Sequence, residues 1–194
     1  MVTRESWRDD AARWNARYAE GAPTFEPHPF VAEAFAAGFP EGPVLELACG
    51  RSGSALALAE RGRRVLAVDV SDVALRQLHG EARRRGLADR VWCVRADLRT
   101  FALPPEAFGF VLATLFWDPA VFRAARDAVA PGGLLGWEAL TGNGDAESRR
   151  FRVSPGELSA SLGARWEVLR EDDGDDHGPR RHETCRLLAR AARE

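Results

Sequence analysis

Acidic and small residues follow one another at the ends of three apolar segments of the sequence. The first segment ends in Glu46–Cys49 and leads into a run of small residues up to Gly53, the second ends at Asp69, and the third ends at Asp97. Carboxylates accept hydrogen bonds from hydroxyl, amino and ammonium groups. Glycine lets a ligand approach the backbone closely. The pattern predicts a ligand site, provided that the three segment ends meet in space.

Each acid favours a different partner. Asp69 is suited to accept hydrogen bonds from both hydroxyls of a ribose, and Ser71 is the expected cap of the helix that follows. Asp97 is suited to an adenine amino group, and its alternative is an acid exposed to solvent. Glu46 argues against a pyrophosphate, because an acid attracts a cation such as the ammonium of an amino acid. The loop 48–53 presents amides near a helix start, or is a tight turn that binds nothing.

Strands and helices alternate along the chain and position these residues. A doubly wound parallel sheet is predicted, since each apolar strand is followed by a helix-length segment. The last two strands are joined by a loop too short for a crossover helix, so they form an antiparallel hairpin. We therefore expect an α/β, Rossmann-like, mostly parallel seven-stranded sheet with a C-terminal antiparallel hairpin and helices on both faces. The expected strands are 43–49, 64–70, 90–97, 109–117, 134–140, 165–172 and 182–191, and the expected helices are 6–20, 30–38, 54–62, 71–86, 118–133 and 154–163.

Length and composition exclude several classes of function. The 194 residues suit a single domain, 1–194, in which residues 1–40 form an N-terminal helical lid and residues 41–194 form the core. The net charge of −2 disfavours nucleic acid as a partner. Three cysteines without a CxxC pair argue against a disulfide framework and a zinc site, so no metal is expected. The sequence shows no apolar leader and no stretch of membrane-spanning length, which indicates a cytoplasmic protein without membrane contact.

Four motifs together resemble those of class I S-adenosylmethionine-dependent methyltransferases. They are "VLELACGRSGSALALAERG", "RVLAVDVSDVAL", "VRADL" and "VAPGGLLGWEAL", and they cover roughly residues 40–140. The chain is more closely similar to the tellurite-resistance and thiopurine-type small-molecule branch. The segments "RWNARYAEGAPTFEPHPF" and "FRVSPGELSASL" resemble the tellurite-resistance proteins. Ala48 and Ser52 depart from the family's pattern, since many relatives have glycine at both positions.

The resemblance implies S-adenosylmethionine as cofactor and assigns its site residues. The methionine half lies at Glu46 and the loop 48–53, and Asp69 binds the ribose. Val70 lines the adenine, and Asp97 with the Leu98 amide reads its edge. The full set of implied cofactor residues is Glu46, Ala48, Gly50, Gly53, Asp69, Val70, Asp97, Leu98 and Thr114.

The implied reaction is an in-line methyl transfer to a small molecule, by a monomer or homodimer. Such a displacement mainly requires alignment, and a soft nucleophile needs no strong base. His177 and Arg180 in the hairpin loop are catalytic candidates, or solvated loop residues. The substrate candidates also have structural explanations, as packing aromatics, a solvated histidine or a surface arginine; they are Trp14, Tyr18, His28, Trp117 and Arg152. Two alternatives stay open: an S-adenosylmethionine-binding module without catalysis, and an NAD(P)-dependent oxidoreductase.

Overall fold

The structure, a computed structural model, describes residues 4–141, 152–175 and 183–193. Contacts between residues divide the chain into two compact units. The first unit comprises residues 1–33 and 43–102, and the second comprises residues 34–42 and 103–194.

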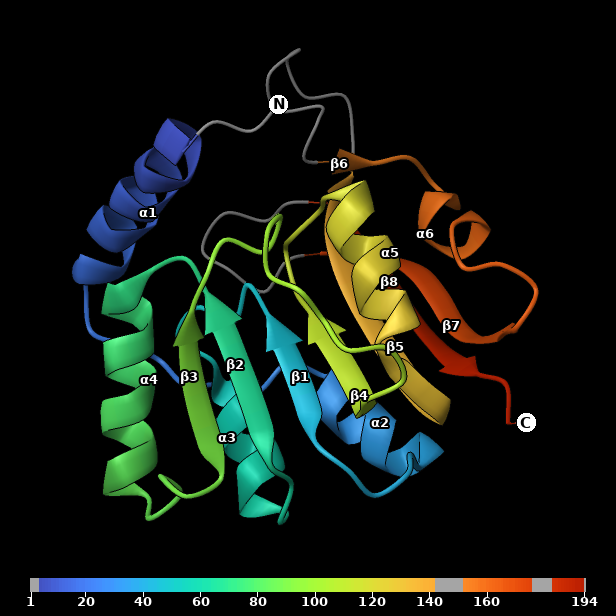
Figure 1. The fold of residues 1–194 in the computed structure, drawn as a ribbon, viewed down its shortest axis with the longest axis horizontal. Coiled ribbons are helices and arrows are strands. Elements are labelled where there is room, and N and C mark those ends of the chain that lie inside the picture. The colour runs from blue at the N-terminus through green and yellow to red at the C-terminus, as the bar shows by residue number, and fades with distance from the viewer. Residues whose placement is uncertain (1–3, 142–151, 176–182, 194) are drawn as a thin grey trace. The chain divides into compact units, whose positions relative to one another are not determined.

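The first unit is built on three parallel strands in the order β3-β2-β1 (Figure 1). β1 (Val44–Leu47), β2 (Val65–Asp69) and β3 (Val91–Arg95) alternate along the chain with α3 (Gly53–Glu60) and α4 (Asp72–Arg84). The first two strands are almost fully buried and consist mainly of Val and Leu, as expected for a sheet covered on both faces. Because the strands are parallel, their carboxyl ends meet at one edge.

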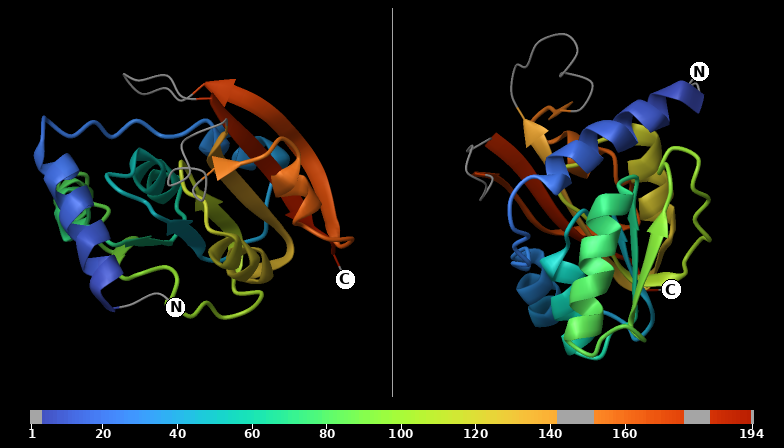
Figure 2. Two further views of the ribbon diagram at one scale, coloured as in Figure 1. Left: turned by 90° about the horizontal axis from the view of Figure 1, so that it is seen from above. Right: turned by 90° about the vertical axis from the view of Figure 1, so that its left-hand side faces the viewer.

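Helix α1 (Arg4–Ala19) belongs to the first unit and contacts α4, and the right-hand view of Figure 2 shows it crossing the end at which α4 begins. α2 (Phe30–Ala37) follows α1 after an extended segment, and its first residues Phe30 and Val31 are buried. Residues 1–33 therefore belong to the first unit, whereas the second half of α2 and the residues up to 42 belong to the second unit.

The second unit contains strands in the order β4-β5-β8-β7, with the short β6 paired to β5. β4 and β6 run parallel to β5, whereas β8 runs antiparallel to both β5 and β7. The ring of Phe122 on α5 packs edge-on against Trp137 on β5, with centroids 5.0 Å apart. The elements are β4 (Phe108–Ala113), α5 (Pro119–Asp127), β5 (Val129–Thr141), β6 (Arg152–Val153), α6 (Glu157–Ala160), β7 (Trp166–Asp175) and β8 (Glu183–Ala191).

The fold class is confirmed, and within the described ranges the mixed sheet has eight strands instead of the seven expected. The additional strand is β6, which pairs with β5 over only two residues. α5 ends at Asp127, six residues before the expected end, and β5 begins at Val129. Pro131 has no backbone N–H with which to continue the helix. The chain instead pairs with β4 from Val129 onward, where Phe108 lies opposite Val129.

One hydrophobic side chain of the first unit stands out at the surface. Trp92 on the edge strand β3 is 45% exposed. The described residues 96–107 that follow β3 form turns and loops instead of a helix.

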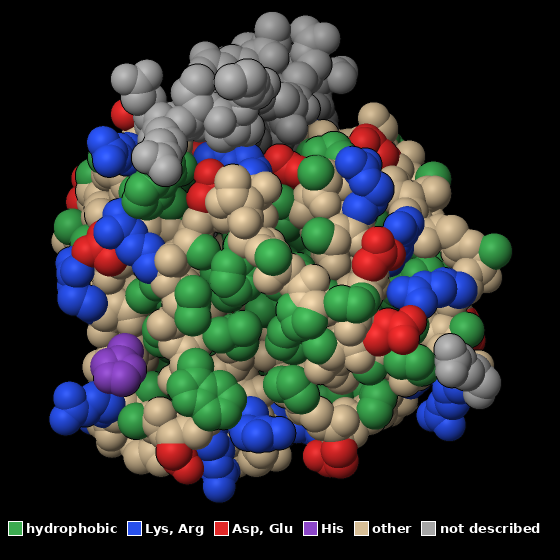
Figure 3. Space-filling view, viewed as in Figure 1, with side chains coloured by type: hydrophobic (Ala, Val, Ile, Leu, Met, Phe, Trp, Pro, Cys, Tyr) green, Lys and Arg blue, Asp and Glu red, His purple; other side chains and the backbone are tan. Residues whose placement is uncertain are grey.

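Figure 3 shows hydrophobic side chains gathered on the face viewed there. Among the residues that the structure describes, no helix is both long and apolar enough to cross a membrane.

Candidate functional site

The loop between β1 and α3 is tied directly to the end of β2. The backbone amide of Gly50 donates to Asp69 Oδ2 at 2.8 Å, and the amide of Ser71 donates to Asp69 Oδ1 at 2.7 Å. Ser71 in turn caps α4 by accepting a hydrogen bond from Ala74, as expected. Burial raises the pKa of Asp69, and the hydrogen bonds from Ser71 and Gly50 act in the opposite direction. Two of the predicted site residues, Gly50 and Asp69, are thus brought into contact.

Ala48 has a left-handed backbone, with φ of +49°. A residue with a Cβ pays on the order of 1 kcal/mol for this conformation, whereas glycine does not. We therefore expect Ala48→Gly to raise the free energy of unfolding by about 1 kcal/mol, measured by urea denaturation. Ala57→Gly, inside the regular helix α3, serves as the control and should lower it by about 1 kcal/mol. Equal losses in the two variants would contradict the left-handed assignment.

Glu46 is a buried carboxyl group with one close side-chain donor. Its side chain is 4% exposed, and Ser52 Oγ donates to Glu46 Oε2 at 2.6 Å. Ser52 also caps α3, because the same oxygen accepts from the Ala55 amide at 2.8 Å. Burial raises the pKa of Glu46 to about 8. Glu46 is therefore largely neutral at pH 7, and a cation placed beside it would favour its ionised form.

Asp97 at the end of β3 is held by Arg99 and is not a freely solvated acid. The Arg99 side chain donates to both carboxylate oxygens, at 2.8 and 3.0 Å, and its backbone amide donates to Oδ1. Oδ2 retains a lone pair for a further donor. Val70 and Leu98 lie half-buried in the loops that follow β2 and β3. The adenine-reading role of these residues stays a prediction.

Helix α1 reaches all three of these loops. Tyr18 lies over Gly50, because a Cβ added to Gly50 would be 2.2 Å from the Tyr18 hydroxyl. Asn15 accepts from Ser71 Oγ at 2.7 Å and donates to Asp72 Oδ1 at 2.7 Å. Asp10 accepts from Arg99 at 3.3 Å, next to Asp97. Sequence reasoning missed Asn15 and Asp10, since nothing in a helical pattern distinguishes a docking polar residue from a solvated one.

The segment after α1 crosses the start of α3. A Cβ at Gly53 would lie 2.3 Å from the carbonyl carbon of Glu26, and the His28 amide donates to Ser54 Oγ at 2.9 Å. The His28 ring packs on Phe30 with centroids 4.5 Å apart. Gly53 is therefore needed for the close approach of two backbone segments.

Trp14 stacks on Tyr18, with ring centroids 5.9 Å apart. The guanidinium groups of Arg13 and Arg17 lie over the Trp14 ring at 5.5 and 5.7 Å. These contacts give Trp14 a packing partner, and its substrate role stays a prediction.

In the second unit, the residues after β4 are held against β5. Leu115 has φ of +54°, which ends the strand four residues before the expected Trp117. Trp137 Nε1 donates to the Phe116 carbonyl at 2.8 Å, and Trp117 packs on Phe122 at 5.4 Å. Trp117 is 5% exposed, so it has a structural explanation in packing. Thr114, one residue before the turn, is half-buried.

Arg152 lies on β6, where its Nη1 donates to the Thr141 carbonyl. Its Nε is buried and has no hydrogen-bond partner within the described ranges. The two catalytic candidates, His177 and Arg180, lie outside the described residues. Groups of three or more metal-binding side chains are not found in the described part of the chain.

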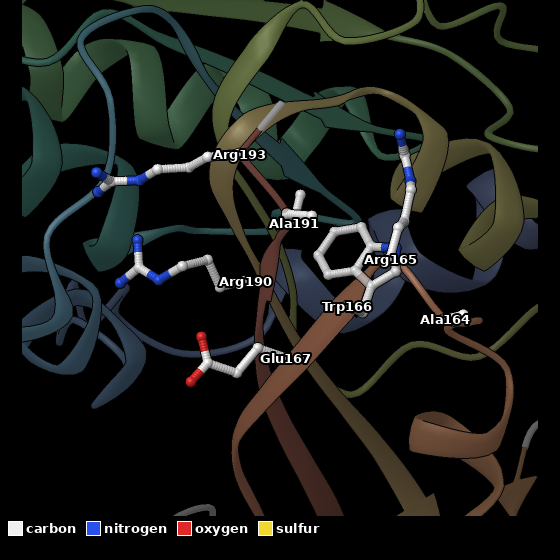
Figure 4. A pocket seen from close by; sticks show the side chains of 8 residues that line it. Ala164, Arg165, Trp166, Glu167, Arg190, Ala191 and Arg193 are labelled. Carbon is white, nitrogen blue, oxygen red and sulfur yellow. The ribbon is translucent and has the colours of Figure 1, made fainter.

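A pocket of about 490 Å³ in the second unit contains none of the predicted site residues (Figure 4). It lies where β7 begins and β8 ends, and Trp166 and Arg190 line it. The Arg190 guanidinium donates to the carbonyls of Ala37 and Gly38, at 2.8 and 2.9 Å, and so caps α2. The side chain of Arg190 therefore has a structural role at the end of α2.

Comparison with known proteins shows similarity in sequence over part of the chain. Residues 44–133 match the family described as Methyltransferase domain. A 2-heptyl-1-hydroxyquinolin-4(1H)-one methyltransferase of Mycobacteroides abscessus is 34% identical over 92 residues, which cover 47% of this chain and 40% of that protein. The chain spans less than half the length of the curated relatives it matches.

Solved structures extend the likeness over nearly the whole chain. TehB from Haemophilus influenzae has a TM-score of 0.74 at 19% identity, covering 92% of this chain and 67% of that chain. Geranyl diphosphate C-methyltransferase from Streptomyces coelicolor A3(2), solved with Mg²⁺, geranyl-S-thiolodiphosphate and S-adenosyl-L-homocysteine, has a TM-score of 0.72 at 14% identity, covering 99% of this chain and 100% of that chain. Residues 44–133 are therefore similar to the methyltransferase-domain family, and the chain shares the fold of TehB and of geranyl diphosphate C-methyltransferase.

Proposed function

We propose that this chain transfers a methyl group from S-adenosylmethionine to a small-molecule acceptor. The observation that carries the proposal is the strand edge of the first unit. There a buried Glu46, a buried Asp69 and the Arg99-bound Asp97 end three adjacent parallel strands. This order of acids matches an ammonium, a ribose and an adenine amino group.

The residues present fit the cofactor. Each carboxylate oxygen of Asp69 accepts one backbone N–H and keeps a lone pair for a ribose hydroxyl. Glu46 is placed to accept from the cofactor's ammonium, in the loop that also contains Ala48, Gly50 and Gly53. Val70, Asp97 and the Leu98 amide would surround the adenine. Thr114 belongs to the second unit, and its contact with the cofactor is part of the proposal.

The bound cofactor supplies an activated methyl group on a sulfonium. The chain's own residues then need to hold an acceptor in line and exclude water. We assign residues 1–40 as a lid. Helix α1 and the segment 25–28 support this assignment, because they contact the loops after β1, β2 and β3. Trp14, Tyr18 and His28 are the lid's candidate acceptor contacts.

The remaining acceptor contacts are assigned to the second unit. Trp117, Arg152, His177 and Arg180 are the candidates, and Arg152 offers a buried N–H to an acceptor anion. The quinolone methyltransferase among the relatives supports a small acceptor by analogy. We further propose a cytoplasmic location and a monomeric or homodimeric enzyme without nucleic-acid partners.

Asp69→Ala tests the cofactor site. It removes an acceptor of two ribose hydroxyls, so we expect S-adenosylmethionine to bind roughly 10- to 100-fold more weakly in calorimetric titration. Asp89→Ala, at an exposed acid of the same unit, should leave binding unchanged. An unchanged dissociation constant in a folded Asp69→Ala variant would remove Asp69 from the site.

A separate assay decides between the alternatives. Wild-type protein is incubated with S-adenosylmethionine and a panel of small thiols, phenols and amines, and S-adenosylhomocysteine is quantified. Turnover supports the enzyme, whereas tight binding without turnover on any acceptor favours a binding module. Thermal stabilisation by NAD(P)H but not by S-adenosylmethionine would favour the oxidoreductase.

A further inference from the structure

Arg51 carries a positive charge that the described protein does not balance. It lies in the loop between β1 and α3, and its Nη1 is buried without a hydrogen-bond partner among the described residues. Its guanidinium lies over the Tyr18 ring, 5.3 Å from the centroid. A buried N–H without an acceptor is unfavourable, and more so when the group is charged.

The two buried acids of β1 and β2 have other partners. Asp69 accepts from the amides of Gly50 and Ser71, and Glu46 accepts from Ser52. Burial favours the neutral form of Glu46, and a neutral carboxyl group does not balance the charge of Arg51. The N-terminus of α3 begins two residues later, at Gly53, and its dipole adds positive potential. The loop is therefore electropositive at Arg51, and the raised pKa of Glu46 favours its uncharged form.

We propose that Arg51, with the Tyr18 hydroxyl beside it, binds the carboxylate of the cofactor's methionine half. This inference rests on the proposed function. A carboxylate would accept a charge-assisted hydrogen bond from the buried Nη1 and neutralise the guanidinium. The ammonium of the same amino acid would face Glu46 and stabilise its ionised form. The loop thus presents one cationic and one acidic side chain, five positions apart, to the two charges of a zwitterion.

The competing explanation is purely structural. In that case Arg51 only packs on the Tyr18 ring and helps to dock α1 on the loop. The two explanations predict different effects of Arg51 on the affinities of two ligands that differ only in the carboxylate. S-adenosylmethionine and its decarboxylated form share the adenosine, the sulfonium and the ammonium, so their comparison isolates that group.

The experiment titrates both ligands into the full chain by calorimetry. We expect wild-type protein to bind S-adenosylmethionine roughly 10- to 100-fold more tightly than decarboxylated S-adenosylmethionine. Arg51→Gln should reduce this ratio to about 1–3 by weakening only S-adenosylmethionine. Arg51→Lys keeps the charge without the planar fork and should give an intermediate ratio. Arg64→Gln, at an exposed arginine before β2, is the control that should keep the wild-type ratio.

The outcomes separate this inference from the proposed function. A ratio that stays at the wild-type value in folded Arg51→Gln overturns the carboxylate assignment, even if both ligands bind. Equal loss of both ligands favours the docking role and also overturns it. Failure of the wild-type protein to bind either ligand, or 5′-methylthioadenosine, would instead refute the cofactor site as a whole.

Discussion

Gly53→Ala is expected to lower the free energy of unfolding by about 3 kcal/mol. The added methyl group would lie 2.3 Å from the carbonyl carbon of Glu26, 2.4 Å from its oxygen and 2.5 Å from the carbonyl carbon of Phe25. All three atoms belong to the backbone, so no rotation of a side chain relieves the contact. The segment 25–28 would have to leave the start of α3, and cofactor affinity should fall with it.

Gly80→Ala is the matched control in α4. Both glycines are helical, but a Cβ at Gly80 meets nothing within 4 Å. Alanine has the higher helix propensity, so Gly80→Ala should raise the free energy of unfolding by about 1 kcal/mol. Urea denaturation of the two variants measures both changes in the free energy of unfolding, which should have opposite signs. If Gly53→Ala also stabilised the protein, the segment 25–28 would not lie against α3 in solution.

Glu46→Gln is expected to stabilise the ligand-free protein at pH 8 and to weaken cofactor binding. The raised pKa of Glu46, about 8, means that the folded state keeps a proton which the unfolded state releases above its ordinary pKa. Stability is therefore greatest below the unfolded-state pKa and falls as pH rises toward 8, by about 1.4 kcal/mol per pH unit from this group. Glutamine stays neutral at every pH and removes this loss.

The measurement is the difference in unfolding free energy between Glu46→Gln and wild type at pH 5 and pH 8. We expect that difference to grow by about 3 kcal/mol in favour of the variant. Glu20→Gln, at an exposed acid, should show no such growth. A difference that does not change with pH would contradict the neutral, buried Glu46.

Cofactor binding should respond in the opposite direction. The ammonium requires the ionised carboxylate, so binding below pH 8 releases a proton from Glu46 in wild type. Titrations in buffers of different ionisation enthalpy detect this proton release. Glu46→Gln should abolish the release and weaken cofactor binding roughly 10- to 100-fold. The same residue thus costs stability and supports binding.

The sequence was sufficient for the architecture and for the acids at the strand ends. Strand-length apolar runs alternating with capped helices determine a parallel sheet, and Ser71 and Asp118 cap the helices as expected. Parallel strands bring their ends to one edge, which is why Glu46, Asp69 and Asp97 were foreseeable. Their assignment as site residues follows from their chemistry and from the family resemblance.

The rest depends on contacts between distant segments, which no local pattern encodes. β6 exists only because Arg152 and Val153 meet the end of β5. Leu115 takes a left-handed backbone although leucine has no preference for it. Asn15 is one of several polar residues on α1, and only the docked helix shows that it bonds to the start of α4. The buried Nη1 of Arg51 likewise has no counterpart in the sequence pattern.

The hydrogen bond from the Val73 amide to Asn15 Oδ1, 3.3 Å long, makes the first helix observable by isotope exchange. Residues 15 and 73 are 58 positions apart, so this amide is shielded only while α1 is docked. Its exchange with deuterated water therefore reports the frequency at which α1 leaves α4, separately from global unfolding. Slower exchange in the presence of S-adenosylhomocysteine would measure, residue by residue, how far the ligand holds this helix in place.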